Sequence, residues 1–310
     1  MFAVEFHYFH DDTTHPRCQG SLSAADLERM LDHLQARYTL LNAADFLETA
    51  LAGTGRPDQI CLTFDDGVRS QLDVAVPVLE ARGLTGMFFC YSSHFCQDIS
   101  MLEVYHDFRF RCYETVEQFY ADFFACLKND PAVYNERIAR GMEAFSYDAY
   151  LPHCSWHSYT DKLFRYTRDC LLTPQQYRLL MAQLMLRRGY DWKKRSADLW
   201  IDAQALQALE KKGHLIGLHS HTHPTNITAL SREAQWLEYA ENQRQLSQIL
   251  NHPVTVAAYP CGKYHEGTLA DMARLKVNLA FTAEMTDYAD PLRMPRKNHP
   301  LVWAEMLSDS

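Results

Sequence analysis

Two aspartates side by side, Asp65 and Asp66, follow a short apolar run that begins at Ile60. The run is continuous rather than alternating, which is typical of a strand buried on both faces. Adjacent carboxylates repel each other unless a cation neutralises them. A divalent metal ion that binds one carboxylate and leaves the other as a base would suit such a pair. On its own, Asp-Asp-Gly could equally be a turn followed by a helix cap.

Two histidines four residues apart, His219 and His223, follow a second strand-like run at 214–218. With 15 histidines in 310 residues, roughly 0.7 such pairs are expected by chance, so the spacing alone decides nothing. Their position after a strand favours a site, because parallel strands end at one rim of a sheet. Two imidazoles and one carboxylate leave metal positions open for water and substrate. His221, between them, is interpreted as a surface residue or a neighbour that supports the ligands.

The segments that must position these residues alternate between strands and helices. Helix starts are indicated by capping residues, among them Ser23, Asn42 and Ser231. Strand alternating with helix predicts a parallel sheet or a barrel. The strand-like runs lie at 2–9, 38–41, 60–64, 85–91, 214–218, 254–259 and 278–283, with a last edge at 293–295 before Arg296 and His299.

Residues 97–197 interrupt the alternation with mainly helical periodicity. Apolar side chains share one helical face, namely Phe119, Phe123, Phe124 and Leu127. A segment of this length is too long for a loop. We therefore predict a long helical insertion over the rim of the sheet or barrel.

Composition excludes several classes of protein. A net charge of −9 disfavours nucleic acid as a partner. No apolar run reaches about 18 residues, so no membrane span is expected. Nine cysteines are scattered without Cys-x-x-Cys spacing, which argues against a disulfide framework or a zinc ribbon. Together with an N-terminus that has no signal-peptide core, this predicts a cytoplasmic protein.

Three segments in this order resemble the first three motifs of the polysaccharide deacetylases, carbohydrate esterase family 4. They are Thr-Phe-Asp-Asp-Gly at 63–67, His-Ser-His-Thr-His-Pro at 219–224 and Ala-Tyr-Pro-Cys-Gly at 258–262. The first alone should occur by chance in on the order of 10⁻⁴ of chains this long. Phe9-His10-Asp11 resembles the branch of the family that begins with a Tyr-His first strand. The resemblance covers about residues 1–95 and 198–300.

The resemblance implies a distorted (β/α)7 barrel, as one domain over 1–310 with the helical insertion within it. Asp66, His219 and His223 would bind a divalent metal, most often zinc in such sites. Asp65 would be the general base that takes the proton of the attacking water. The metal and the backbone N–H of Cys261 would stabilise the tetrahedral oxyanion.

The chain departs from the family at Ala258, where many members have an arginine that steadies the base. Arg296 is the candidate substitute, because a closed barrel places the last strand beside the first. The alternative is that Arg296 is a surface cation.

The general acid that protonates the leaving amine has two candidates. Many members use a late histidine, which would be His299. The branch with the Tyr-His start uses the first-strand histidine, which would be His10. We predict His10, because it ends the first strand on the active rim, and we expect the other histidine to be structural.

These residues predict a hydrolase that removes an N-acyl group, most often N-acetyl, from an amino sugar or saccharide. The alternatives are a hydrolase of a non-sugar amide or ester, and a catalytically silent saccharide-binding protein. Only the missing arginine supports the silent protein, and the presence of Asp65 argues against it. Aromatic residues of the insertion could stack on sugars, but a helical core or a homo-oligomer interface is favoured. They are Trp156, Tyr159, Phe164, Tyr166 and Trp192.

Overall fold

The structure is a computed structural model of residues 1–310, and it describes every residue except 97–98, 153, 155–156, 287–289 and 309–310. The chain forms two compact units, each with its own core. The first unit comprises Met1–Met101 and Asp198–Ser310, and the second comprises Leu102–Ala197. The second unit therefore shares nearly all of its residues with the predicted insertion at 97–197.

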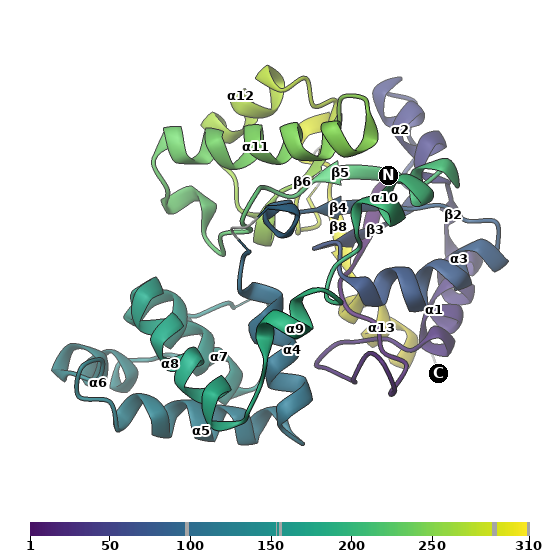
Figure 1. The fold of residues 1–310 in the computed structure, drawn as a ribbon. Coiled ribbons are helices and arrows are strands. Elements are labelled where there is room, and N and C mark those ends of the chain that lie inside the picture. Colours follow the sequence, from purple (N-terminus) through teal and green to yellow (C-terminus); the bar gives the residue numbers. More distant parts are fainter. Residues whose placement is uncertain (97–98, 153, 155–156, 287–289, 309–310) are drawn as a thin grey trace. The chain divides into compact units, whose positions relative to one another are not determined.

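A parallel sheet forms the centre of the first unit, with helices around it (Figure 1). Hydrogen-bonded neighbours follow the order β7-β6-β5-β4-β3-β1-β8, and the short β2 pairs beside β3. Every strand pair is parallel. The strands are β1 (Phe2–Phe6), β2 (Thr39–Leu40), β3 (Gln59–Asp65), β4 (Met87–Cys90), β5 (Leu215–Leu218), β6 (Val256–Ala258), β7 (Leu279–Phe281) and β8 (Arg296–Asn298).

The two edges of this sheet nearly meet. Met294, just before β8, forms a parallel bridge with Phe281 at the end of β7. On the other side, Arg296 of β8 pairs with Ala3 of β1. The sheet is thus a nearly closed seven-stranded barrel, which confirms the predicted (β/α)7 fold. The last strand lies three residues later than the predicted edge at 293–295.

Alternate residues along each strand form two separate apolar clusters, because side chains in a strand alternate between faces. One cluster contains Phe6 and Phe64 and packs against residues of the surrounding helices, such as Leu31. The other contains Ala3 and Phe281, whose side chains lie on the opposite face of the strands. The second cluster therefore lies inside the barrel. Residues of β1 with odd numbers share this inner face.

The helices of the first unit begin close to the predicted caps. Ser23 forms a capping box with Asp26 at the start of α1. Asn42 precedes α2, but its side chain accepts a hydrogen bond from the Thr85 backbone N at 2.8 Å instead of capping its own helix. The helices are α1 (Ala24–Arg37), α2 (Ala43–Leu51), α3 (Val76–Ala81), α10 (Ala203–Lys211), α11 (Arg232–Leu250), α12 (Glu266–Arg274) and α13 (His299–Ser308). Helices α11 and α12 lie side by side (Figure 1).

The predicted helix at 68–82 is irregular at its start. A π-helical turn, Gln71–Ala75, precedes α3. The Gln71 side-chain amide donates to the backbone oxygens of His7 at 2.8 Å and Asp65 at 2.5 Å. The Gln71 side chain thus connects His7, just after β1, to Asp65, the last residue of β3.

The second unit is helical and has an aromatic core. Phe119, Phe123 and Phe164 are fully buried, and the ring centroids of Phe123 and Phe164 are 4.9 Å apart. This confirms the core interpretation for Phe164, whereas Trp156 lies outside the described residues. The helices are α4 (Leu102–Cys112), α5 (Val116–Lys128), α6 (Glu136–Glu143), α7 (Tyr159–Tyr166), α8 (Pro174–Arg187) and α9 (Trp192–Ser196).

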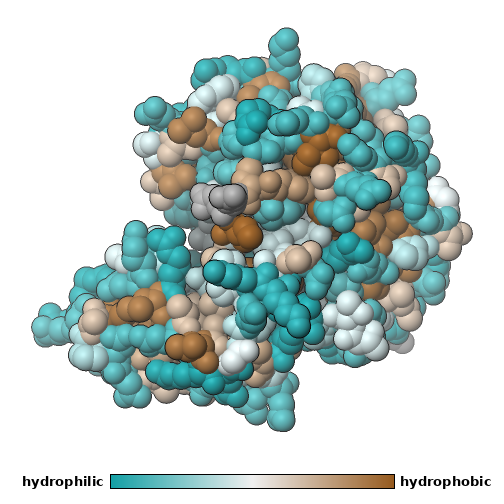
Figure 2. Space-filling view, in the orientation of Figure 1, coloured by the Kyte–Doolittle hydropathy of each residue, from teal (hydrophilic) through white to brown (hydrophobic). Residues whose placement is uncertain are grey.

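The surface and the cysteines agree with the composition. Hydrophilic residues cover most of the face seen in Figure 2, with hydrophobic residues in small groups. All nine cysteines, each within the described residues, are free thiols. In the described part of the chain, no helix has the length and apolar character that crossing a bilayer requires.

Candidate metal centre and active site

The turn after β3 holds Asp66 in an uncommon backbone conformation. Asp66 has φ 74° and Gly67 has φ 61°. Left-handed conformations cost an L-residue free energy and persist where the surrounding structure enforces them. A Cβ atom on Gly67 would lie 2.7 Å from the Cys90 Sγ. The glycine of the motif is therefore required both by its φ and by its packing against β4.

The loop after β5 brings both histidines to the same carboxylate. The Nε2 atoms of His219 and His223 lie 3.6 Å and 3.2 Å from Asp66 Oδ1. His219 Nδ1 is 2.9 Å from the Ala258 backbone oxygen. That contact places the N–H on Nδ1 and leaves the Nε2 lone pair facing Asp66. The three residues predicted as metal ligands are thus brought together.

This donor set fits a divalent metal ion. Asp66 Oδ1 is buried and has no hydrogen-bond partner among the described residues. Burial lowers the pKa of His219 and His223 to about 4, so both imidazoles are neutral at pH 7. Burial also raises the pKa of Asp66, a change that a nearby cation would reverse. One carboxylate and two neutral imidazoles are ligands that zinc and similar ions use.

Asp65, unlike Asp66, is paired with a buried cation. Arg296 donates two hydrogen bonds to Asp65, at 2.7 Å and 2.8 Å, and its Nε donates to the Thr282 backbone oxygen at 2.6 Å. Burial would raise the pKa of Asp65, but the Arg296 guanidinium and His219 hold it well below its usual range. Arg296 is 1% exposed, so the surface-cation alternative is wrong. Arg296 makes the contact with Asp65 that the sequence analysis expected of a substitute for the arginine missing at Ala258.

Comparison with known families supports the resemblance seen in the motifs. Residues 187–280 match the family model described as polysaccharide deacetylase. The matched segment contains His219, His223 and Cys261. Over this segment the chain is similar to the polysaccharide deacetylases. No curated protein matches its sequence.

Solved structures of deacetylases share the fold of this chain at low sequence identity. IcaB from Ammonifex degensii has 13% identity and a TM-score of 0.58, covering 99% of this chain and 95% of that chain. The deacetylase PplD from Streptococcus pyogenes, solved with acetate, has 14% identity and a TM-score of 0.53, covering 96% and 91%. A de-N-acetylase from Aggregatibacter actinomycetemcomitans has 10% identity and a TM-score of 0.53, covering 95% and 93%.

The histidine beside the candidate site at the end of the first strand is His7, which the sequence analysis missed. Phe6 pairs with Phe64, so the next residue along each strand brings His7 beside Asp65. Nitrogen and oxygen atoms of Glu5, His7 and Asp65 lie within 4.8 Å of one another. Burial lowers the pKa of His7, but the carboxylates of Glu5, Asp66 and Asp65 outweigh it and raise the pKa. His7 is therefore favoured in its protonated form.

His10 contacts Ser21 and Asp12 rather than the residues around Asp65. β1 ends at Phe6 rather than at Phe9, and the backbone of His10 pairs with Leu22. Its Nδ1 is 2.9 Å from Ser21 Oγ, and its Nε2 is 4.0 Å from Asp12 Oδ1. The prediction that His10 ends the first strand on the active rim is wrong, because the strand stops pairing four residues before it.

His299 packs on the outer side of the barrel. Its ring stacks on Phe6 at a centroid distance of 5.6 Å. Its Nε2 is 2.7 Å from the Gly20 oxygen and its Nδ1 is 3.2 Å from the Glu5 oxygen. Burial lowers the pKa of His299 to about 4. This neutral, enclosed ring begins α13 and has the surroundings of a structural histidine.

The third motif forms a tight turn after β6. Cys261 has φ 54° and lies in the 3₁₀ turn Pro260–Gly262. A Cβ atom on Gly262 would lie 2.7 Å from the Ala283 Cβ. Ala258, at the end of β6, accepts the hydrogen bond from His219. The turn thus starts beside a metal-ligand candidate, and the backbone N–H of Cys261 stays a predicted oxyanion donor.

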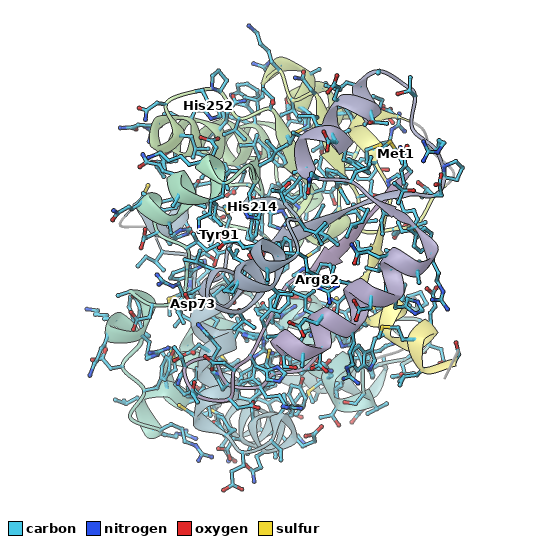
Figure 3. The ribbon with its side chains drawn as sticks, turned by 90° about the vertical axis from the view of Figure 1, so that its right-hand side faces the viewer. Met1, Asp73, Arg82, Tyr91, His214 and His252 are labelled. Carbon is cyan, nitrogen blue, oxygen red and sulfur yellow. The ribbon has the colours of Figure 1, made fainter. Side chains whose placement is uncertain are left out.

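Aromatic side chains enclose the histidine loop on one side. Tyr91, labelled in Figure 3, follows β4 and is fully buried. Its ring centroid is 5.8 Å from that of His223 and 6.1 Å from that of Trp200, whose Nε1 donates to the Tyr91 hydroxyl. The spacing along the strand could have identified Tyr91 from the sequence, because Tyr91 lies two residues after Phe89, which faces inward.

Proposed function

We propose that this chain is a metal-dependent hydrolase that removes an N-acyl group, N-acetyl above all, from an amino sugar or saccharide. The observation that carries the proposal is that the two aspartates at the end of β3 have different partners. Asp66 converges with His219 and His223, while Asp65 is paired with Arg296. The family match supports a deacetylase, and the relative PplD was solved with acetate, the small product of such a reaction.

Asp66, His219 and His223 would hold the metal ion. Bound there, a divalent ion such as zinc supplies a Lewis acid that polarises the acyl carbonyl and lowers the pKa of water. Asp65 acts as the general base and takes the proton of the attacking water. The two hydrogen bonds from Arg296 keep Asp65 ionised and fix the direction of its oxygens.

His7 is the proposed general acid in place of His10 and His299. The reaction must deliver a proton to the leaving amine nitrogen, and His7 carries one next to Asp65. Glu5, with an oxygen 3.6 Å from His7 Nε2, favours the charged imidazolium. The Cys261 N–H remains the proposed donor to the oxyanion that forms on the acyl oxygen.

The buried ion pair between Arg296 and Asp65 disfavours the alternative of a catalytically silent saccharide-binding protein. A buried ion pair is costly to assemble, and binding alone does not need an ionised Asp65. A hydrolase of a non-sugar amide or ester differs from the proposal only in substrate. Amine release from N-acetylhexosamine oligomers, compared with hydrolysis of acetyl esters and ureide-type amides, separates these activities.

The deciding experiment removes metal-ligand candidates one at a time. We expect Asp66→Ala and His223→Ala to lose bound metal and amine release together, because each deletes one of three ligands. His252→Ala, which alters a histidine on an exposed turn, should retain both. Metal content is measured by elemental analysis and rate by amine formation. Full metal content and full rate in Asp66→Ala or His223→Ala would overturn the proposal.

A further inference from the structure

A second group of side chains that could bind a metal includes His221, in the histidine loop. Ligand atoms of Cys96, His221 and Glu241 all lie within 4.8 Å of one another. The three side chains are half-buried, so an ion could reach them from solvent. None of them belongs to the group formed by Asp66, His219 and His223.

The His221 ring is held in place from both sides. Its Nδ1 is 2.9 Å from Ser92 Oγ, which leaves Nε2 available as a ligand. Its backbone oxygen accepts hydrogen bonds from the N–H groups of Ser92 at 3.1 Å and Ser93 at 2.9 Å. Its backbone N donates to Glu238 Oε2 at 2.9 Å. A ligand held this firmly loses little conformational entropy when an ion binds.

The Gln245 side chain contacts both the Cys96 sulfur and the Glu241 carboxylate. Its Nε2 donates to both Cys96 Sγ and Glu241 Oε1, each at 2.8 Å. The positive end of an amide dipole therefore lies between two groups that present lone pairs. Arg244 also donates to Glu241, at 2.6 Å and 2.8 Å. A carboxylate has about four lone-pair positions, so Glu241 can keep Arg244 and still bind an ion.

We propose that Cys96, His221 and Glu241 form a second metal site, for zinc or a divalent ion of similar softness. One sulfur, one nitrogen and one oxygen are ligands that zinc accepts in a tetrahedral site. Magnesium and calcium prefer oxygen ligands alone, so the thiolate disfavours them. Water completes the fourth position.

The ion would fasten three segments that lie far apart along the chain. Cys96 belongs to the segment after β4, Glu241 to α11, and His221 to the loop between the two catalytic-site histidines. Residues 238, 241 and 245 are spaced three and four apart, so they share one face of α11. An ion at this face holds the loop that presents His219 and His223. The site therefore stabilises the catalytic loop and takes no part in the reaction itself.

Cobalt(II) tests the site by spectroscopy without reference to activity. Thiolate ligation gives cobalt a sulfur-to-metal charge-transfer band in the near ultraviolet, which carboxylate and imidazole ligands lack. We expect the band in the wild-type protein and in Asp66→Ala, which spares the second site. Cys96→Ser should lose the band, whereas Cys261→Ser, which alters the cysteine of the third motif, should keep it. A band that survives in Cys96→Ser, or no band in the wild type, overturns the proposal.

Glu241→Gln gives an independent test that leaves the thiol in place. We expect the charge-transfer band to require at least tenfold more cobalt for half-saturation, because the carboxylate charge is lost. Gln248→Ala, on the exposed side of α11, is the control and should titrate like the wild type. Circular dichroism establishes that each variant is folded. Equal cobalt affinities in Glu241→Gln and the wild type contradict the site even if Cys96→Ser does not fold.

Discussion

Asp65 and Asp66 are adjacent in the chain and have opposite electrostatic surroundings. Arg296 lowers the pKa of Asp65, and burial raises that of Asp66. Neighbouring carboxyl groups whose pKa values are driven apart can take different roles in one reaction. The shift favours the ionised form of Asp65, the proposed base, and disfavours that of Asp66, which a bound cation would favour. The proposed assignment of base and ligand therefore rests on the different environments of two identical side chains.

Arg296→Lys tests the pair of hydrogen bonds that Arg296 donates to Asp65. Lysine keeps the positive charge but cannot donate two parallel hydrogen bonds, whereas alanine would leave a buried charge unpaired at about 3–5 kcal/mol. We expect kcat to fall at least tenfold with metal content unchanged. The pKa of Asp65 should rise, so the acidic limb of the kcat–pH profile should move to higher pH. Arg293→Lys, which alters the surface pair with Asp290, is the control; an unchanged profile in Arg296→Lys contradicts the role.

His7→Gln tests the general acid. His7 must be protonated to donate, so the rate of the wild-type enzyme should fall as pH rises through its raised pKa. We expect the variant to lose at least a hundredfold in kcat, consistent with general acid catalysis, and to lose the alkaline limb of the kcat–pH profile. Metal content should be unchanged. His10→Gln is the matched control, and the assignment fails if His10→Gln loses activity while His7→Gln retains it.

At the scale of elements, α11 positions the histidine loop through a buried polar face. Asn242 Oδ1 accepts from the His219 backbone N at 2.9 Å, and Asn242 Nδ2 donates to the Cys90 oxygen at 3.0 Å. Glu238 accepts from the backbone N atoms of His221 and Thr222 at 2.9 Å and 2.8 Å. These bonds satisfy backbone groups that a tight turn leaves unpaired. The helix therefore positions the ligands without touching the reacting atoms.

Asn242→Ala tests this positioning. Residues that orient metal ligands typically contribute 10–100-fold to metal affinity, so we expect a loss of about that size. Zinc affinity is measured by competition with a chromophoric chelator. Gln248→Ala removes an amide from the exposed side of the same helix and should bind zinc like the wild type. Equal affinities in Asn242→Ala and Gln248→Ala would show that α11 does not orient the loop.

At the scale of the whole molecule, the metal-ligand candidates belong to one of the two units. Asp66, His219 and His223 lie in the first unit. The second unit, Leu102–Ala197, has its own core around Phe119 and Phe164. A ligand that binds only the folded state stabilises the unit that contains its site. The metal should therefore stabilise the two units unequally.

Hydrogen exchange with and without a chelator tests this difference. We expect metal removal to speed amide exchange at the ends of β3 and β5, where the ligands are attached. Amides in α5 and α8 of the second unit should exchange at unchanged rates. Peptide-resolved mass spectrometry makes the measurement. Equal acceleration in both units would show that they unfold as one cooperative body.

The sequence alone determined the motifs and their order, because strand ends, glycine turns and caps are local. It placed Asp65, Asp66, His219 and His223 at the ends of apolar runs, but it selected His10 rather than His7 as the first-strand histidine. Only the tertiary structure decided where β1 stops, since a strand ends where its partner β3 ends. Only the near-closed barrel brings Arg296 to Asp65, because 231 residues separate them and pairing across the closure joins them. Local patterns determine which residues can do chemistry, and long-range pairing determines which of them meet.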